Sequence, residues 1–419
     1  MLTTLLLLII SADTLNLTLD QAVGTALRVS PTSADARLDS VDGRSKYLQG
    51  WAEVIPTPSA SAGLGWSNSQ SFLDSTKRST SHSVSFSVGA SQVIFDPNVV
   101  GAVAQGYAGR QLSYYSSWSK LNTLVWNVRT AYFGLQKAYA LLDVSNSAVQ
   151  LAQNNYDLAQ VKLKLGQSTG IDLLRAQTNL QQARLNLMSA ETGLLTASEA
   201  FKGQLGMTDE VIIKPVAIDT NPPTAAFASR TDYWQAVDTG NPSLQLARLT
   251  VKVAEIGKKV AYGRMLPSLS FSISERYSDS MLPSASNPWS RNDGLSWGFN
   301  LSLPIINVPQ ILLGINSAKI ALERARISLQ SSEITIRQTA TSAWLSYEQT
   351  ARQVAYAAEN LRLNQELYRQ AQEQYRLGQL TQLDLFTVET GLIQARISYL
   401  SGLADVQSDL AQLYYLLGK

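Results

Sequence analysis

The pattern Gly-Gln-x-Thr-x-x-Asp-Leu occurs twice in this chain of 419 residues, once from Gly166 and once from Gly378. The two copies are 212 residues apart (166 to 378), and the same offset aligns further matching residues without a gap from Ala131 to Gly206 of the first copy. A repeat of this length indicates two copies of one structural unit and not a solenoid built from short repeats. The chain is therefore expected to fold as one architecture made of two similar halves.

The repeat divides the chain into a first structural repeat over 13–206 and a second over 231–419, joined by a proline-containing linker over 207–230. Residues 1–12 hold a short apolar run followed by small residues, which resembles the remnant of a secretory signal peptide. The run is shorter than the roughly 20 residues that a membrane-spanning helix needs, and no later segment is apolar for long enough either. A chain of this kind could cross a membrane only as β-strands.

Each repeat contains a predicted β-hairpin, over about 58–92 in the first and about 267–304 in the second. In the second hairpin Leu269, Phe271 and Ile273 alternate with serines, and the first hairpin shows the same alternation. One apolar face and one small polar face are typical of a sheet that separates two environments. Four strands are too few to close a barrel in lipid, where the smallest barrels have about eight. Strands that face lipid would therefore require an oligomer, a dimer or a trimer.

A long helical hairpin follows each β-hairpin, over about 98–206 and about 310–418. No proline interrupts the first arm of either one, 98–165 or 310–377, and helix-forming residues dominate both arms. A helix of about 68 residues is roughly 100 Å long, far beyond the average of about 11 residues in globular proteins. Such an arm must pack along its length against the returning arm, as an antiparallel coiled coil.

The repeated motif has a structural explanation as a turn between two helices. Its glycine suits the left-handed conformation that ends a helix, its threonine suits the N-cap of the next helix, and its aspartate suits the third position of a capping box. A cation before each turn complements the carbonyl end of the helix. On the residues alone, this structural role is favoured over a functional role for Asp172 and Asp384. The other turn residues are Lys164, Gly166, Thr169 and Leu173 in the first copy and Arg376, Gly378, Thr381 and Leu385 in the second.

Composition argues against catalysis and against nucleic acid as a partner. The net charge is only +2, the charged fraction of 16% lies below the roughly 25% of soluble domains, and no basic stripe is interleaved with aromatics. Cysteine is absent, which excludes disulfides, thiolate zinc sites and an acylated cysteine. The single histidine, His82, cannot form a metal site alone. Because no phosphate-binding loop, nucleophile elbow or paired-carboxylate motif is found, we expect no enzyme activity, catalytic residue, metal or cofactor.

The order of these elements resembles the TolC-type outer membrane efflux proteins, with two tandem halves that each hold a proline-initiated helix, a β-hairpin, a long helix and a Gly-x-x-Thr-x-x-Asp-Leu turn. The resemblance covers Leu17 to Gly418. It implies a mixed α and β membrane protein, a homotrimer whose twelve strands form one β-barrel in the outer membrane of a Gram-negative-type cell. A long antiparallel α-helical coiled-coil barrel continues it into the periplasm.

The resemblance also implies a function. It predicts a passive exit duct of a tripartite efflux or type I secretion system. A periplasmic adaptor protein would open the tip of the duct, and an inner-membrane pump would feed it. The adaptor is expected to dock on the two turns, at Lys164, Gly166, Thr169 and Leu173 of the first and at Arg376, Gly378, Thr381 and Leu385 of the second.

The same resemblance assigns a gate to the second turn. An aspartate at the position of Asp384 lines the constriction as a ring of carboxylates, and a tyrosine at the position of Tyr375 bonds to an aspartate at the position of Asp172. Two positions depart from the pattern, because Thr387 stands for a second ring aspartate and Leu380 for an arginine that locks the closed state. The sequence thus predicts a gate with one acidic ring and one fewer polar latch.

Two other functions fit parts of the sequence. A periplasmic coiled-coil scaffold without channel activity accounts for the long helices but not for the strand pattern that holds Trp66, Trp297 and Phe299. An autonomous porin-like channel accounts for the strands but not for the long helices. No motif identifies the cargo or the class of pump.

Overall fold

The computed structural model describes residues 14–70, 78–207, 211–219, 229–279, 293–303 and 308–419. The predicted signal-peptide remnant over 1–12 lies outside these residues, as do parts of the hairpin loops and of the linker. The chain divides into two compact units, one formed by 1–38, 117–244 and 333–419 and the other by 39–116 and 245–332. Each unit therefore draws on both halves of the sequence.

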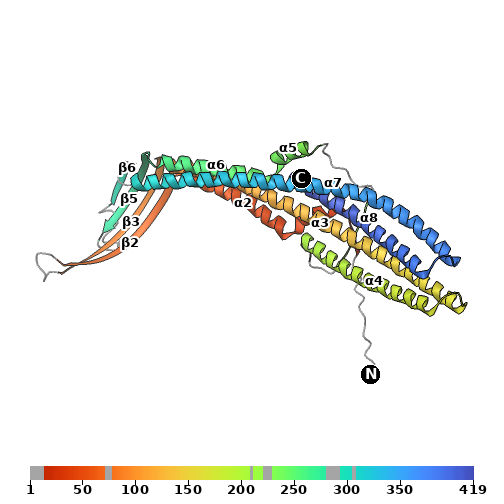
Figure 1. Ribbon diagram of the computed structural model, residues 1–419. Coiled ribbons are helices and arrows are strands. Elements are labelled where there is room, and N and C mark those ends of the chain that lie inside the picture. The colour runs from red at the N-terminus through yellow and green to blue at the C-terminus, as the bar shows by residue number, and fades with distance from the viewer. Residues whose placement is uncertain (1–13, 71–77, 208–210, 220–228, 280–292, 304–307) are drawn as a thin grey trace, which may run out of the picture. The chain divides into compact units, whose positions relative to one another are not determined.

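Four long helices dominate the chain (Figure 1): α3 (Pro97–Lys164), α4 (Gly170–Leu205), α7 (Val308–Arg376) and α8 (Gln382–Leu416). Their bounds confirm the predicted helices to within a residue or two. The longest two, α3 and α7, have 68 and 69 residues. Among the helices described, none is both long and apolar enough to cross a membrane.

Two shorter helices precede each β-hairpin: α1 (Leu19–Val29) and α2 (Pro31–Ala52) before the first, and α5 (Arg230–Gly240) and α6 (Pro242–Gly263) before the second. Thr18 caps α1 in a capping box, because its hydroxyl accepts from the Gln21 amide at 3.3 Å and the Gln21 side chain accepts from the Thr18 amide at 3.0 Å. Both α2 and α6 begin at a proline, the residue whose missing N–H costs nothing in the first helical turn. Helix α5 was not predicted as a separate element.

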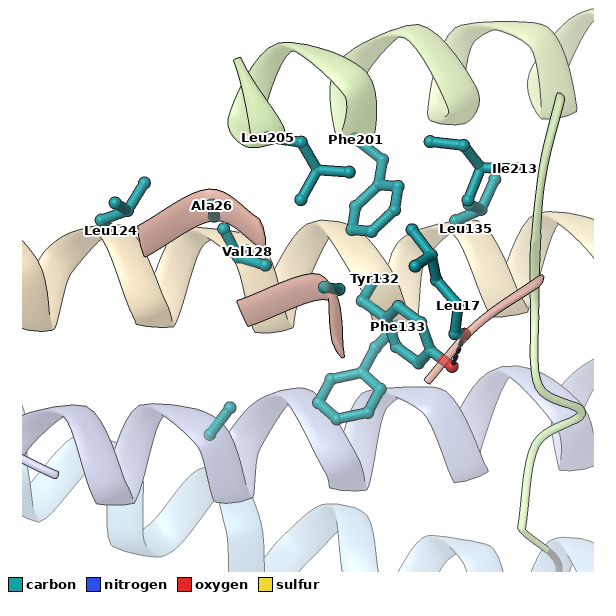
Figure 2. Packing of buried hydrophobic residues seen from close by; sticks show 12 residues of the cluster. Leu17, Ala26, Leu124, Val128, Tyr132, Phe133, Leu135, Phe201, Leu205 and Ile213 are labelled. Carbon is teal, nitrogen blue, oxygen red and sulfur yellow. Dashed lines mark hydrogen bonds between the residues drawn. The ribbon is translucent and has the colours of Figure 1, made fainter. Parts of the chain in front are cut away.

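The main core of unit 1 lies where α1, α3 and α4 meet a pair of short parallel strands, β1 (Thr14–Leu17) and β4 (Ile212–Pro215). Figure 2 shows Tyr132 of α3 at this junction, next to Phe201 of α4. The Tyr132 hydroxyl donates to the Leu17 carbonyl at 3.0 Å and accepts from the Val216 amide at 3.1 Å. One buried side chain thus joins the first strand to the segment between the two sequence halves.

A second core of unit 1 forms around α5. Tyr233 and Val237 of α5 are buried against α7 and α8, and the Tyr233 hydroxyl donates to the Leu413 carbonyl at 3.2 Å. Side-chain amides satisfy two carbonyls at the end of α8, because Asn122 donates to Tyr415 at 2.7 Å and Asn241 donates to Leu416 at 2.9 Å. These contacts anchor the last helix by its C-terminal end.

Unit 2 holds one antiparallel sheet with the strand order β2-β3-β5-β6. The strands are β2 (Thr57–Gln70), β3 (Arg78–Phe95), β5 (Ser268–Asp279) and β6 (Asp293–Ser302). They fall in the two predicted hairpins. Strand β3 continues past the expected end at 92 to Phe95, with a bulge between Val93 and Phe95. Within the described residues β2 and β6 each pair with one strand only, so both edges of the sheet present unpaired backbone groups.

The two faces of this sheet differ in polarity, as the alternation predicted. The pairing register places Leu64 opposite Val84 and Phe271 opposite Phe299 on one face. Large side chains on this face are exposed, including Trp66 at 77% and Trp297 at 67%. An open apolar surface of this kind needs a lipid or protein partner.

The opposite face is lined by serine and glycine. Serine hydroxyls bond across neighbouring strands, between Ser61 and Ser87 at 2.8 Å and between Ser274 and Ser296 at 3.0 Å. A side chain on Gly63 would approach the Ser85 hydroxyl to 2.9 Å, so small residues keep this face smooth. The face is polar and carries little charge.

Candidate functional site

The turn between α3 and α4 is built by local hydrogen bonds, as the repeated motif predicted. Gly166 has a φ of +71°, its amide donates to the Leu163 carbonyl at 3.0 Å, and the next amide donates to the Lys162 carbonyl at 2.8 Å. This pair of bonds is a Schellman motif. Thr169 then caps α4, because its hydroxyl accepts from the Asp172 amide at 3.2 Å.

Asp172 closes the capping box from the other side. Its carboxylate accepts from the Thr169 hydroxyl at 2.7 Å, from the Thr169 amide at 3.1 Å and from the Ser168 hydroxyl at 3.2 Å. The hydrogen bond from the Thr169 hydroxyl is the main reason that the pKa of Asp172 lies below its usual value. The structural explanation of this aspartate is confirmed.

The turn between α7 and α8 repeats this arrangement in part, because Thr381 caps α8 but its amide makes no hydrogen bond to Asp384, so the predicted capping box is incomplete. Gly378 has a φ of +77°, and its amide donates to the Tyr375 carbonyl at 3.2 Å. The Thr381 hydroxyl accepts from the Asp384 amide at 3.2 Å and donates to the Asp384 carboxylate at 2.5 Å. Asp384 is exposed to solvent in the single chain, as is Thr387 one turn later.

One side chain links the two turns, which lie at the same end of unit 1 (Figure 1). The ammonium of Lys162, on α3, donates to the Tyr375 carbonyl in the last turn of α7 and lies 3.8 Å from the centre of the Tyr375 ring. Lys162 is only 9% exposed, and burial lowers its pKa. A cation at the carbonyl end of a helix and over an aromatic face is favourable on both counts.

The predicted bond between Tyr375 and Asp172 is not present in this structure. Among the described residues the hydrogen bonds of Asp172 stay within its own turn, and the Tyr375 hydroxyl makes none to it. Burial raises the pKa of Tyr375 and the nearby Asp172 carboxylate adds to the shift, so the two groups are neighbours without being bonded. The contact that joins α7 to the first hairpin comes instead from Lys162. Sequence reasoning missed this lysine and chose Lys164, which is exposed.

Other predicted docking residues differ in accessibility. Leu385 is completely buried beneath the second turn, where it packs with Tyr368, Tyr375 and Leu392, and the half-buried Leu380 packs on the same cluster. Leu385 therefore supports the turn from inside and cannot present a surface to a partner, which corrects the prediction from the motif. Leu173 is half-buried.

Lys164, Gly166, Thr169, Gly378 and Thr381 are exposed and accessible to a partner. Arg376 is also exposed and forms a 3.5 Å ion pair with Glu373.

The exposed apolar residues near the turns line a groove between the first turns of α4 and α8. The groove has a volume of about 420 Å³. Three of its side chains are more than half exposed: Ile171 at 63%, Leu174 at 63% and Leu383 at 53%. Polar side chains complete the lining, namely Arg175, Thr178, Asn179, Gln182 and Gln382, and Phe386 closes one wall. The groove is amphipathic and close to both turns.

Comparison with known proteins matches this chain to the model of the outer membrane efflux protein family over residues 22–207 and again over 235–419. These two matches cover most of the chain.

The chain belongs to the outer membrane efflux protein family.

Its relatives in this family include the probable efflux pump outer membrane protein TtgC of Pseudomonas putida, which is 24% identical over 93% of this chain and 80% of TtgC. The outer membrane efflux protein BepC of Brucella suis is 22% identical over 75% of this chain and 68% of BepC. The crystal structure of CusC shares the fold, with a TM-score of 0.83 and 19% identity over 95% of this chain and 91% of CusC. The chain is an efflux channel protein of the outer membrane with an extension into the periplasm.

We predict that Lys162→Met loosens the end of α7, because it removes the only side-chain donor to the Tyr375 carbonyl among the described residues while keeping the apolar stem. A hydrogen bond from a charged group is worth about 1.5–3 kcal/mol, so backbone amides over 374–380 should exchange hydrogen about tenfold faster or more. Tyr375→Phe should change this exchange little. The control is Lys164→Met, which alters an exposed cation two residues away. Faster exchange in Tyr375→Phe than in Lys162→Met would contradict the assignment.

Proposed function

We propose that this protein is the passive exit duct of a tripartite efflux or type I secretion system. A periplasmic adaptor opens its tip, and an inner-membrane pump supplies the cargo. The observation that carries the proposal is the combination of two features in one chain of an efflux channel family. One is a sheet with an exposed apolar face and two open edges, and the other is a pair of helical hairpins linked at their turns. We assign the chain no catalytic activity and no cofactor.

The open sheet supports a homotrimer. Backbone groups at the unpaired edges of β2 and β6 would remain unsatisfied in lipid. Three copies placed edge to edge would pair them and close a twelve-stranded β-barrel, with aromatic side chains toward lipid and serines toward the lumen. The long hairpins would continue the barrel as a coiled-coil tunnel. The family match in two segments supports the division into repeats over 13–206 and 231–419 with a linker over 207–230.

The mass of the purified particle tests this assembly. We expect three chains per particle and a requirement for detergent, because Trp66 and Trp297 would otherwise be exposed to water. The measurement is light scattering with detergent and lipid subtracted, followed by removal of detergent. A particle that stays soluble without detergent would show that the strands do not face lipid, and the periplasmic scaffold would then replace the duct.

We propose Asp384 as the constriction ring of the duct. It is the third residue of α8, it is exposed in the single chain, and its carboxylate accepts a hydrogen bond from Thr381. Three copies around one axis would bring three carboxylates together and favour cations by Coulomb attraction. Thr387 lies one turn further along α8 and would add a neutral hydroxyl ring.

Replacing Asp384 with Asn should lower the ratio of cation to anion permeability about two- to tenfold, because the ring charge is lost. The measurement is the reversal potential of single channels in a planar bilayer under a KCl gradient. Asp405→Asn is the matched control, since Asp405 is a half-exposed carboxylate on the same helix that pairs with Lys137. Unchanged selectivity in Asp384→Asn would remove the ring assignment.

We propose that the adaptor docks in the groove between the first turns of α4 and α8 and on the exposed turn residues around it. An apolar centre formed by Ile171 and Leu174 with a polar rim is the usual make-up of a protein contact surface. Docking there would separate α8 from α4 and draw the second turn away from the axis. The partner must bind the opened state more tightly than the closed one, since equal affinity shifts no equilibrium.

Crosslinking in cells tests this surface. The chain has no cysteine, so Thr178→Cys can carry a photo-activated crosslinker at a single position in the groove. We expect a crosslink to the adaptor, identified by mass spectrometry, and a drop in yield of roughly tenfold when Leu174→Asp is added. Leu38→Asp, which changes an exposed leucine of α2, is the control. Crosslinks to other copies of this chain alone would refute docking at the groove.

A further inference from the structure

A buried carboxyl group lies within the apolar packing above the second turn. Glu389 of α8 is only 2% exposed and stands between Leu385 and Leu392, which belong to the core cluster beneath the turn. Asn155 of α3 donates its side-chain amide to Glu389 at 2.6 Å. Residues three and four apart share a helix face. Glu389 therefore lies on the same buried face of α8 as Leu385 and Leu392, in a position suited to an apolar side chain.

An ionised carboxylate at Glu389 would receive a single hydrogen bond in this part of the structure. Asn155, which is 4% exposed, donates that bond, and the hydroxyl of Tyr368 of α7 makes none to Glu389 although Tyr368 is only 8% exposed. A buried carboxylate is stable only when it is well bonded or paired. Burial accordingly raises the pKa of Glu389 to about 7, although the Asn155 bond opposes the shift.

Charged groups around the cluster do not compensate for this deficit. Helix α8 contributes Arg396 and α7 contributes the Tyr368 phenol, while α4 lines the adjoining groove with the neutral Asn179 and Gln182. On α3 the nearest cation before Asn155 is Lys137, which pairs with Asp405 at 3.0 Å. The nearest cations after it are Lys162, whose ammonium donates to the Tyr375 carbonyl, and the exposed Lys164. The groove of about 670 Å³ that Glu389 lines gives water a route to the carboxyl.

The position is specific to the second hairpin. At the repeat offset of 212 residues, the first hairpin has Gln177, a neutral and exposed side chain. At this position of the repeat, α8, which carries the proposed ring residue in its first turn, has an ionisable group and α4 does not.

We propose that Glu389, held by Asn155, is a positioning residue of the gate that packs α8 against α3 when it is protonated and releases α8 when it is ionised. This inference rests on the proposed function, because it makes proton concentration a second control on the tip beside the adaptor. The direction of the pH dependence follows because the Glu389 carboxyl is a stronger acid when it is exposed to water than when it is buried. Opening releases a proton, so alkaline conditions favour the open tip and acidic conditions the packed one.

Hydrogen exchange on the full-length protein in detergent tests the packing step. Amides over 385–395 are followed between pH 5 and 8 in the wild type and in Glu389→Gln, which mimics the protonated carboxyl. Dividing the wild-type exchange rate by the rate of the variant removes the direct effect of pH on amide exchange. We expect this ratio to rise at least about tenfold from pH 5 to pH 8. Most of the rise should occur below pH 7, where Glu389 is protonated in the packed form and ionised in the exposed form. A flat ratio would overturn the proposal.

Three further variants sharpen the test. Asn155→Leu removes the one donor and should move the midpoint to higher pH, whereas the double variant Asn155→Leu, Glu389→Leu should stay packed at every pH. Glu359→Gln, an exposed carboxyl of α7 paired with Arg362, is the control and should behave as the wild type. A double variant that keeps the pH dependence would refute the role of Glu389.

Channel opening in planar bilayers separates this inference from the proposed function. We expect open probability to rise from pH 5 to 8 in the wild type and to be constant in Glu389→Gln. Equal pH dependence in both proteins would overturn the link to the gate. A protein that never conducts would refute the duct itself, and the exchange ratio would then still decide whether α8 packing depends on protonation.

Discussion

The ends of the long helices are the constraint on which this structure depends. A helix leaves several carbonyls and amides without partners at its ends, and here two hairpins must reverse direction within a few residues. Glycines with φ between 71° and 77° follow α3, α4, α7 and α8. Threonine caps begin the two returning helices. Each turn is therefore complete in its own hydrogen bonds. Near the turns, the polar contacts between the two hairpins within the described residues come from Lys162 and Asn155 of α3.

This self-sufficiency would allow the proposed gate to move at the turns. If the turns depended on each other for their hydrogen bonds, moving one hairpin would unfold both. Near the turns, the described contacts between the hairpins are individually modest and include Lys162 with the Tyr375 carbonyl, Asn155 with Glu389, and the leucines between them. Lys162 and Asn155 are seven residues apart on α3, which places them on one face, two helical turns apart. The contacts of Lys162 and Asn155 could then hold the ends of α7 and α8 against α3, and their loss would release these ends together.

Much of the fold was predictable from the sequence because the signals were local and repeated. Proline at the first position, glycine at the end and alternating serines define α6, the two turns and the sheet within a few residues. The strands β1 and β4 escaped prediction because four residues are too few to show a period, and they pair across nearly the whole first half. Helix α5 escaped prediction because its 11 residues, Arg230–Gly240, are too few to show a clear apolar period.

The site was harder to predict than the fold. The capping role of Asp172 follows from its spacing to Thr169, whereas the Lys162 contact joins residues 213 positions apart and leaves no mark on either segment. The motif included Leu385 among the docking residues but did not indicate which face of α8 it lies on. Its spacing of seven residues from Leu392 would have placed it on the buried face. The buried position of Glu389 could have been predicted from the sequence. It lies four residues after Leu385 and three before Leu392, which is the spacing of residues on one buried helix face.

The serine face of the sheet has a consequence for transport. A hydroxyl can rotate to donate or accept, so a wall of serines offers every solute a similar, weak interaction. The strand pairing places a single charged side chain, Arg276, on this face within the described residues. Such a wall therefore creates few deep free-energy minima in which a passing molecule would stall. In the proposed duct, the sheet would therefore let many kinds of molecule pass and would select little among them. The range of exported molecules could then change through mutations in the pump, without changes in this sheet.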